Sequence, residues 1–188
     1  MLPTSSLAGH SPPSTSAFFD PATGVDYVAD RSNASVDIFS GATRSFLGRA
    51  TGFTGQQATT STSGPDGVLT VTSGGKTTLY AGDGNSTLKV FDVTNPAAPS
   101  LLQSISTGGS FRVDEMAYSP LTHQVLAANN ADTPAFGTLF QTTNGSNPVS
   151  IAHSPITVPT AQGASRTAAW SSRYGTPIPE RSSFPSLR

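Results

Sequence analysis

The sequence predicts an all-β fold built from a repeated unit of about fifty residues, and three observations lead to this prediction. The stretch 25–30 (VDYVAD) is matched by 78–83 (TLYAGD) and, less closely, by 124–129 (QVLAAN). A short apolar run follows each stretch and ends at Phe39, Phe91 and Phe140, respectively. Apolar and polar residues alternate with the period of two that half-buried strands show, and no segment has a sustained helical period.

Each repeat is predicted to contain four short strands separated by turns. The breaks are rich in Gly, Pro, Asn and Asp, which supply the positive or preset φ angles that tight turns need. The predicted strands are 17–19, 25–30, 35–40 and 45–51 in the first repeat, 67–73, 77–83, 87–93 and 100–107 in the second, and 113–119, 124–129, 136–142 and 149–158 in the third.

Four antiparallel strands in about fifty residues are typical of one blade of a β-propeller. An immunoglobulin-like sandwich also has closely spaced strands, but it does not repeat internally. The predicted organisation is a flexible segment 1–16, blades at about 17–53, 64–109 and 110–160, and an irregular tail 161–188, with 167–170 as the start of a fourth repeat. Known propellers have at least about four blades, so we expect an incomplete propeller. We expect the chain to be a fragment of a longer propeller, the product of a truncated or rearranged reading frame, or a chain whose ring is completed by self-association.

Composition narrows the range of partners. Charged residues make up 11% of the 188 residues, the net charge is −1, and there is no cysteine. These values argue against a nucleic-acid footprint and exclude a disulfide framework. No stretch is long and apolar enough for a membrane span, and the first residues have no secretory signal. A secreted or extracellular parent protein remains compatible with the sequence.

Three short segments of the sequence resemble propellers of the YVTN type, which belong to the YncE-like and WD40-like superfamily. They are 19–24 (FDPATG), 79–86 (LYAGDGNS) and 113–120 (VDEMAYSP), and the resemblance extends over about 18–159. It implies a propeller fold but no single function, because this superfamily includes scaffolds, surface proteins, lactone hydrolases and dehydrogenases.

The same resemblance suggests a metal site, since lactone hydrolases of the propeller type hold a metal with Glu, Asn and Asp near the central channel. Asp114 and Glu115 open the first strand of the third repeat, and alternation lets only Asp114 or Glu115 face the channel. The candidate ligands for a hard cation such as Ca²⁺ are Glu115, Asn129, Asn130 and Asp132, with Asp114 as a candidate on the channel face. The alternative is that these side chains only cap strands and turns.

Other recurring polar residues favour structural roles. Asp30, Asp83 and Asn129 occupy one position in all three repeats, which indicates turn stabilisation. Glycosylation sequons begin at Asn33, Asn85 and Asn144, about as many as chance would produce. No nucleophile elbow is present, so no catalytic residue is predicted.

The sequence therefore predicts a non-enzymatic repeat protein that binds or scaffolds a protein or glycan partner. The alternative prediction is a metal-dependent hydrolase of the propeller lactonase type. One feature separates the two predictions. A hydrolase needs acidic and amide side chains from separate blades to meet at one site, whereas a binding module does not.

Overall fold

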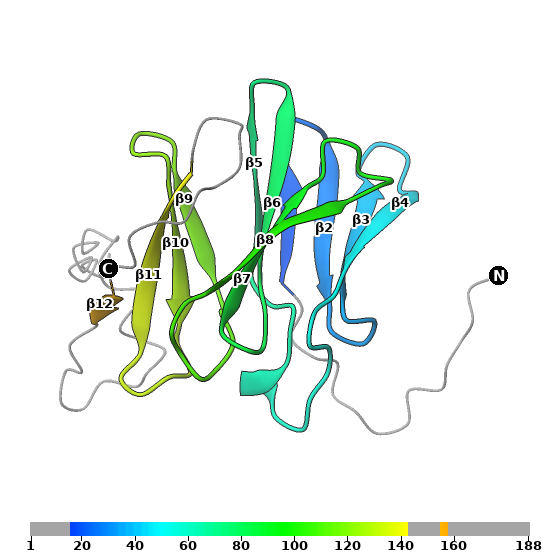
Figure 1. The fold of residues 1–188 in the computed structure, drawn as a ribbon. Coiled ribbons are helices and arrows are strands. Elements are labelled where there is room, and N and C mark those ends of the chain that lie inside the picture. Colours follow the sequence, from blue (N-terminus) through cyan, green and yellow to red (C-terminus); the bar gives the residue numbers. More distant parts are fainter. Residues whose placement is uncertain (1–15, 143–154, 158–188) are drawn as a thin grey trace, which may run out of the picture. The chain divides into compact units, whose positions relative to one another are not determined.

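The computed structural model describes residues 16–142 and 155–157, and within them the fold is all-β. Three four-stranded antiparallel sheets follow one another along the chain, as in an incomplete β-propeller (Figure 1). Blade 1 contains β1 (Ala17–Asp20), β2 (Val25–Asp30), β3 (Ser35–Ser40) and β4 (Phe46–Thr51). Blade 2 contains β5 (Val68–Ser73), β6 (Lys76–Gly82), β7 (Thr87–Asp92) and β8 (Ser100–Ser106). Blade 3 contains β9 (Met116–Ser119), β10 (Gln124–Asn129), β11 (Phe136–Gln141) and β12 (Pro155–Thr157).

Most predicted strands are confirmed to within one or two residues. The largest difference that can be checked is at β9, which begins at Met116 and not at Val113, so that Asp114 and Glu115 precede the strand. The only helical element among the described residues is a single 3₁₀ turn, η1 (Thr60–Thr62), in the connection between blades 1 and 2. The suggested fourth repeat at 167–170 lies outside the described residues.

Each sheet is a simple meander, because neighbouring strands are joined by turns that favour antiparallel pairing. The turn between β5 and β6 shows this clearly, since Gly74 and Gly75 have φ angles of +58° and +76°. Two successive positive φ angles are typical of the two-residue hairpin turns that match strand twist. The repeat extends to fine detail, because β3–β4 and β7–β8 both carry a register shift just before the recurring Phe39 and Phe91.

The blades pack on one another through alternating strand positions. Tyr27 of blade 1 is 1% exposed and belongs to the same buried cluster as Leu79 and Phe91 of blade 2. One position further along β6, Tyr80 is 3% exposed and belongs to a cluster with Val125 and Phe140 of blade 3. Blade 2 is therefore buried on both faces, which explains why β6 and β7 contain few exposed positions.

The first strand of each blade, here called its inner strand, lies closest to the neighbouring blades. The inner strand β5 contacts the inner strands β1 on one side and β9 on the other. This close approach requires glycine at two positions of blade 2. A Cβ at Gly67 would collide with the backbone carbonyl of Asp114, and one at Gly82 would collide with that of Val113. The segments that precede β5 and β9 are thereby brought together, and both carry charged side chains, Asp66 on the first and Arg112 and Asp114 on the second.

Candidate functional site

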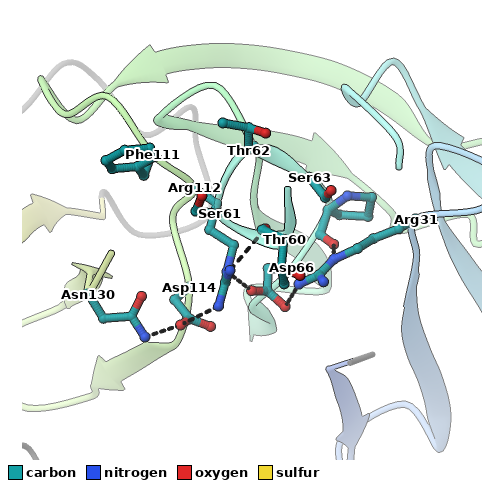
Figure 2. Close-up of polar contacts among 12 residues, drawn as sticks. Arg31, Thr60, Ser61, Thr62, Ser63, Asp66, Phe111, Arg112, Asp114 and Asn130 are labelled. Atoms are coloured by element: carbon teal, nitrogen blue, oxygen red, sulfur yellow. Dashed lines mark hydrogen bonds and ion pairs between the residues drawn. The ribbon is translucent and has the colours of Figure 1, made fainter. Parts of the chain in front are cut away.

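A network of charged and amide side chains lies where the chain enters the first strands of blades 2 and 3 (Figure 2). Its members, here called the polar cluster, are Arg31, Asp66, Arg112, Asp114 and Asn130. Arg31 follows β2, Asp66 precedes β5, Arg112 and Asp114 precede β9, and Asn130 follows β10. The polar cluster therefore joins all three blades.

Backbone pairing positions the two carboxylates in the same way. The amide of Asp66 donates to the carbonyl of Gly82 at 2.9 Å, and the amide of Asp114 donates to the carbonyl of Ala128 at 2.8 Å. Each bond continues the ladder of an inner strand by two residues beyond the strand itself. Asp66 and Asp114 thus occupy equivalent positions in blades 2 and 3.

The charged groups alternate in sign along the polar cluster. One Nη of Arg31 lies 2.5 Å from Oδ1 of Asp66, and Nε of Arg112 contacts Oδ2 of the same carboxylate. A guanidinium nitrogen of Arg112 lies 3.1 Å from Oδ2 of Asp114, which also accepts a hydrogen bond from Nδ2 of Asn130. The Asp66 carboxylate therefore bridges the two guanidinium groups, and the Arg112 guanidinium bridges the two carboxylates.

The backbone completes this arrangement. Nε of Arg31 donates to the carbonyl of Pro65 at 3.2 Å, and a nitrogen of Arg112 donates to the carbonyl of Thr60 at 2.9 Å. The Arg31 side chain is 1% exposed and that of Asp66 is 5% exposed. An ion pair this deeply buried loses much solvation, and its partners depend on each other to remain charged.

Burial, followed by the hydrogen bond and the charge of Asp114, raises the pKa of Asp66 to about 6, although the charges of Arg112 and Arg31 act in the opposite direction. Burial, followed by the charge of Asp114, also raises the pKa of Glu115. At the opposite end of the inner strands, burial of Asp20 is outweighed by hydrogen bonds from Ala22, Thr72 and Thr23, so its pKa is lowered.

These shifts predict the pH dependence of stability. Between about pH 4 and about pH 6 the folded state keeps a proton on Asp66 that the unfolded state releases, so this group's contribution to the unfolding free energy falls as pH rises and is constant above that range. Asp20 acts in the opposite direction: its stabilisation is complete above its unfolded pKa of 3.8 and is lost as pH falls through its lower folded value. Carboxyl ¹³C titration should place the Asp66 midpoint near 6, and a midpoint near 3.8 would contradict the burial argument.

The side chains predicted as metal ligands do not converge on one point but contact different neighbours. Asp114 and Asn130 belong to the polar cluster, whereas Glu115 lies just before β9 and is exposed, with only part of its side chain buried. Asn129 is fully buried, and its Nδ2 donates to Ser86 Oγ at 3.0 Å and to the carbonyl of Phe111 at 3.2 Å. Asp132 accepts from the backbone amide of Ser110 at 2.9 Å. Within residues 16–142 and 155–157, no group of three or more His, Asp or Glu side chains is arranged to hold a metal ion.

The recurring polar position does stabilise turns, but it has a second role in blades 2 and 3. Asp30 accepts hydrogen bonds from the backbone and side chain of Asn33 within its own turn. Asp83 accepts from the backbone and hydroxyl of Thr54, at 2.9 and 2.8 Å, in the connection that leaves blade 1. Asn129 likewise reaches Phe111 in the connection that leaves blade 2. In these two blades the position anchors the preceding connection.

The two glycosylation sequons within the described residues lie in exposed turns. Asn33 and Asn85 are both exposed, in the β2–β3 and β6–β7 turns, and Asn144 lies outside the described residues. Each exposed asparagine also makes a local hydrogen bond: Nδ2 of Asn33 donates to Asp30, and Oδ1 of Asn85 accepts from the hydroxyl of Thr87.

Sequence reasoning singled out Asp114 and Asn130 but missed Arg31, Asp66 and Arg112. A usable signal existed for Asp66, because Asp66 and Asp114 stand at the same distance before the inner strands of successive repeats. No comparable signal marks the two arginines, because Arg31 begins the β2–β3 turn and Arg112 lies in a connection without a repeated pattern.

Comparison of the sequence with protein-family models and with curated proteins found no match. Among the described residues, no helix is long and apolar enough to cross a membrane. The chemistry of the site must therefore be judged from its own geometry.

Proposed function

We propose that this chain is a non-enzymatic β-propeller repeat module that binds or scaffolds a partner, a protein or a glycan, as members of the YVTN and WD40-like superfamily do. One observation carries the proposal: the polar groups near the inner strands are bonded to one another. Asp66 and Asp114 are each held by guanidinium groups, and Asp132 and Asn129 are held by connections between blades. A hydrolase would need several such groups directed at a substrate or a metal ion.

The low charge of the chain also supports this function. A surface with few charged side chains suits protein or glycan partners better than nucleic acid. The exposed sequon residues Asn33 and Asn85 are compatible with a secreted parent protein. On this proposal the polar cluster is a structural connection between blades, and binding takes place on other surfaces.

The experiment compares binding with hydrolysis on the same purified chain. We expect a glycan array and a displayed peptide library to yield ligands that bind equally well with and without Ca²⁺. We also expect no change in the melting temperature on calcium titration and no hydrolysis of simple lactones.

The hydrolase alternative makes the opposite prediction. A calcium-dependent rise in the melting temperature, together with lactone hydrolysis that Glu115→Gln abolishes, would overturn the proposed function. The matched control is Glu180→Gln, which changes the same residue type outside the candidate ligands. Hydrolysis that survives Glu115→Gln would also contradict a binding role, because it would place catalysis elsewhere in the chain.

A further inference from the structure

Blade 1 has one face that no other described sheet covers, and the repeat shows what such a face does elsewhere. We call the face of a blade toward the preceding blade its rear face, and the face toward the following blade its forward face. Across the rear face of blade 1, strand register aligns Phe19, Asp26, Phe39 and Phe46, one from each strand. Phe19 and Phe46 are each 53% exposed.

In the other two blades the centre of the equivalent rear face is buried, although its outer-strand position on blade 2, Leu101, is as exposed as its counterpart Phe46. Phe91 and Phe140, the counterparts of Phe39, are 3% and 1% exposed because they pack against the preceding blade. Phe39 remains partly exposed and stacks edge to face on Phe46 at 5.7 Å. The rear face of blade 1 therefore has the central aromatic residue of a blade junction without the blade that would complete it.

Blade 3 has the complementary forward face. Leu126 pairs with Leu139 across β10 and β11, just as Tyr27 pairs with Ile38 and Tyr80 with Val90. Tyr27, Ile38, Tyr80 and Val90 are almost fully buried against the following blade, whereas Leu126 and Leu139 are only partly buried. The junction thus has a rear half on blade 1 and a forward half on blade 3.

The polar substitutions on these two faces are also complementary. Asp26 stands where blades 2 and 3 have the buried Leu79 and Val125. Gln124 stands where blade 1 has the buried Val25 on its forward face. Val25 and Leu79 share one buried cluster at the junction of blades 1 and 2. A junction between blade 3 and blade 1 would therefore bring an amide donor close to a carboxylate acceptor.

From these observations we infer that a second copy of this chain occupies both faces. The forward face of blade 3 in each copy packs on the rear face of blade 1 in the other. Two such heterologous contacts related by a two-fold axis would close a ring from the three described blades of each copy, six in all, within the range of about four to eight that propellers use. The inference rests on the proposed function in assigning a scaffolding role to these surfaces.

Sedimentation of the full chain over a wide concentration range tests the ring directly. We expect a discrete species of twice the chain mass that grows no further. A monomer at every concentration would overturn the inference, and so would growth into an open series, because the ring would then not close.

Two variants identify the faces involved. Phe39→Asp alters the rear face and Leu126→Asp alters the forward face, and each should raise the dissociation constant of the dimer at least about 30-fold. An equimolar mixture of the two should recover a 1:1 dimer, because one contact in it joins two unaltered faces. Recovery would not occur if like faces paired with like, and that result would overturn the head-to-tail arrangement.

The matched control is Leu121→Asp, at a residue 92% exposed in the β9–β10 turn and outside both faces. It should leave the dimer intact, and dissociation by this control equal to that of the face variants would overturn the assignment. Circular dichroism checks that each variant folds, with Phe39→Ser as the milder rear-face change. Failure of the ring is distinguishable from failure of the proposed function, because a monomer can still bind peptides or glycans and a dimer can still hydrolyse lactones.

Discussion

Replacing Asp66 by alanine is expected to lower the free energy of unfolding by about 3 to 5 kcal/mol, among the largest effects of any single polar substitution in this chain. The Asp66 carboxylate lies between Arg31 and Arg112, and the Arg31 side chain is 1% exposed. Without Asp66, the buried Arg31 guanidinium would lose a carboxylate partner and keep its hydrogen bond to the carbonyl of Pro65. Urea denaturation at pH 7, where Asp66 is ionised, measures the loss.

The matched control is Asp37→Ala in blade 1. Asp37 also binds an arginine through both carboxylate oxygens, at 2.6 and 2.9 Å from Arg49. The Arg49 side chain is 37% exposed, so water can solvate its charge when the partner is removed. We expect a loss of at most about 1 kcal/mol. Equal losses at Asp66 and Asp37 would show that burial of the polar cluster does not decide its contribution.

The second large effect is expected at Phe91, where substitution by alanine should cost about 3 to 5 kcal/mol. Phe91 is 3% exposed, and its ring lies 5.7 Å from that of Phe53 in the cluster that joins blades 1 and 2. The substitution removes apolar contacts and leaves a cavity between two sheets that can close only in part. Urea denaturation gives the loss, and the slope of the transition shows whether unfolding remains cooperative.

Phe46→Ala is the control for this cavity argument. Phe46 is the same residue type in the same kind of sheet, but it is 53% exposed on the rear face of blade 1. Its loss should be less than about 1 kcal/mol when measured at a protein concentration low enough to keep the chain monomeric. A loss as large as that of Phe91 would mean that the face is covered in the isolated chain.

Much of the fold could be predicted because the information is local. Strand alternation and turn residues act over a few positions, so β2, β3 and β10 were predicted with their observed boundaries. The boundary of β9 was wrong by three residues. The amide of Asp114 donates to the carbonyl of Ala128 and the amide of Ala128 donates to the carbonyl of Glu115, so ladder hydrogen bonds continue into 113–115 outside the regular strand. The local pattern of side chains does not distinguish a residue inside a regular strand from one that only extends its hydrogen bonds.

The polar cluster was largely beyond prediction, because it depends on contacts between segments far apart in the chain. Asp66 and Arg112 are separated by more than forty residues, and Arg31 by another thirty-five. Only the packing of β5 against β1 and β9 brings these segments together. The candidate ligands Asn129 and Asp132 lay in the expected turns, but their partners in the 108–112 connection could not be read from spacing.

The sequence by itself determined the repeat, the all-β class and the alternation that gives each blade two apolar faces, because these depend on side-chain periodicity within single strands. The tertiary structure decided which faces are covered, which carboxylates are buried and which charges neutralise one another. Burial and ion pairing depend on distances between blades, and those distances are set by how closely the inner strands approach at positions such as Gly67 and Gly82.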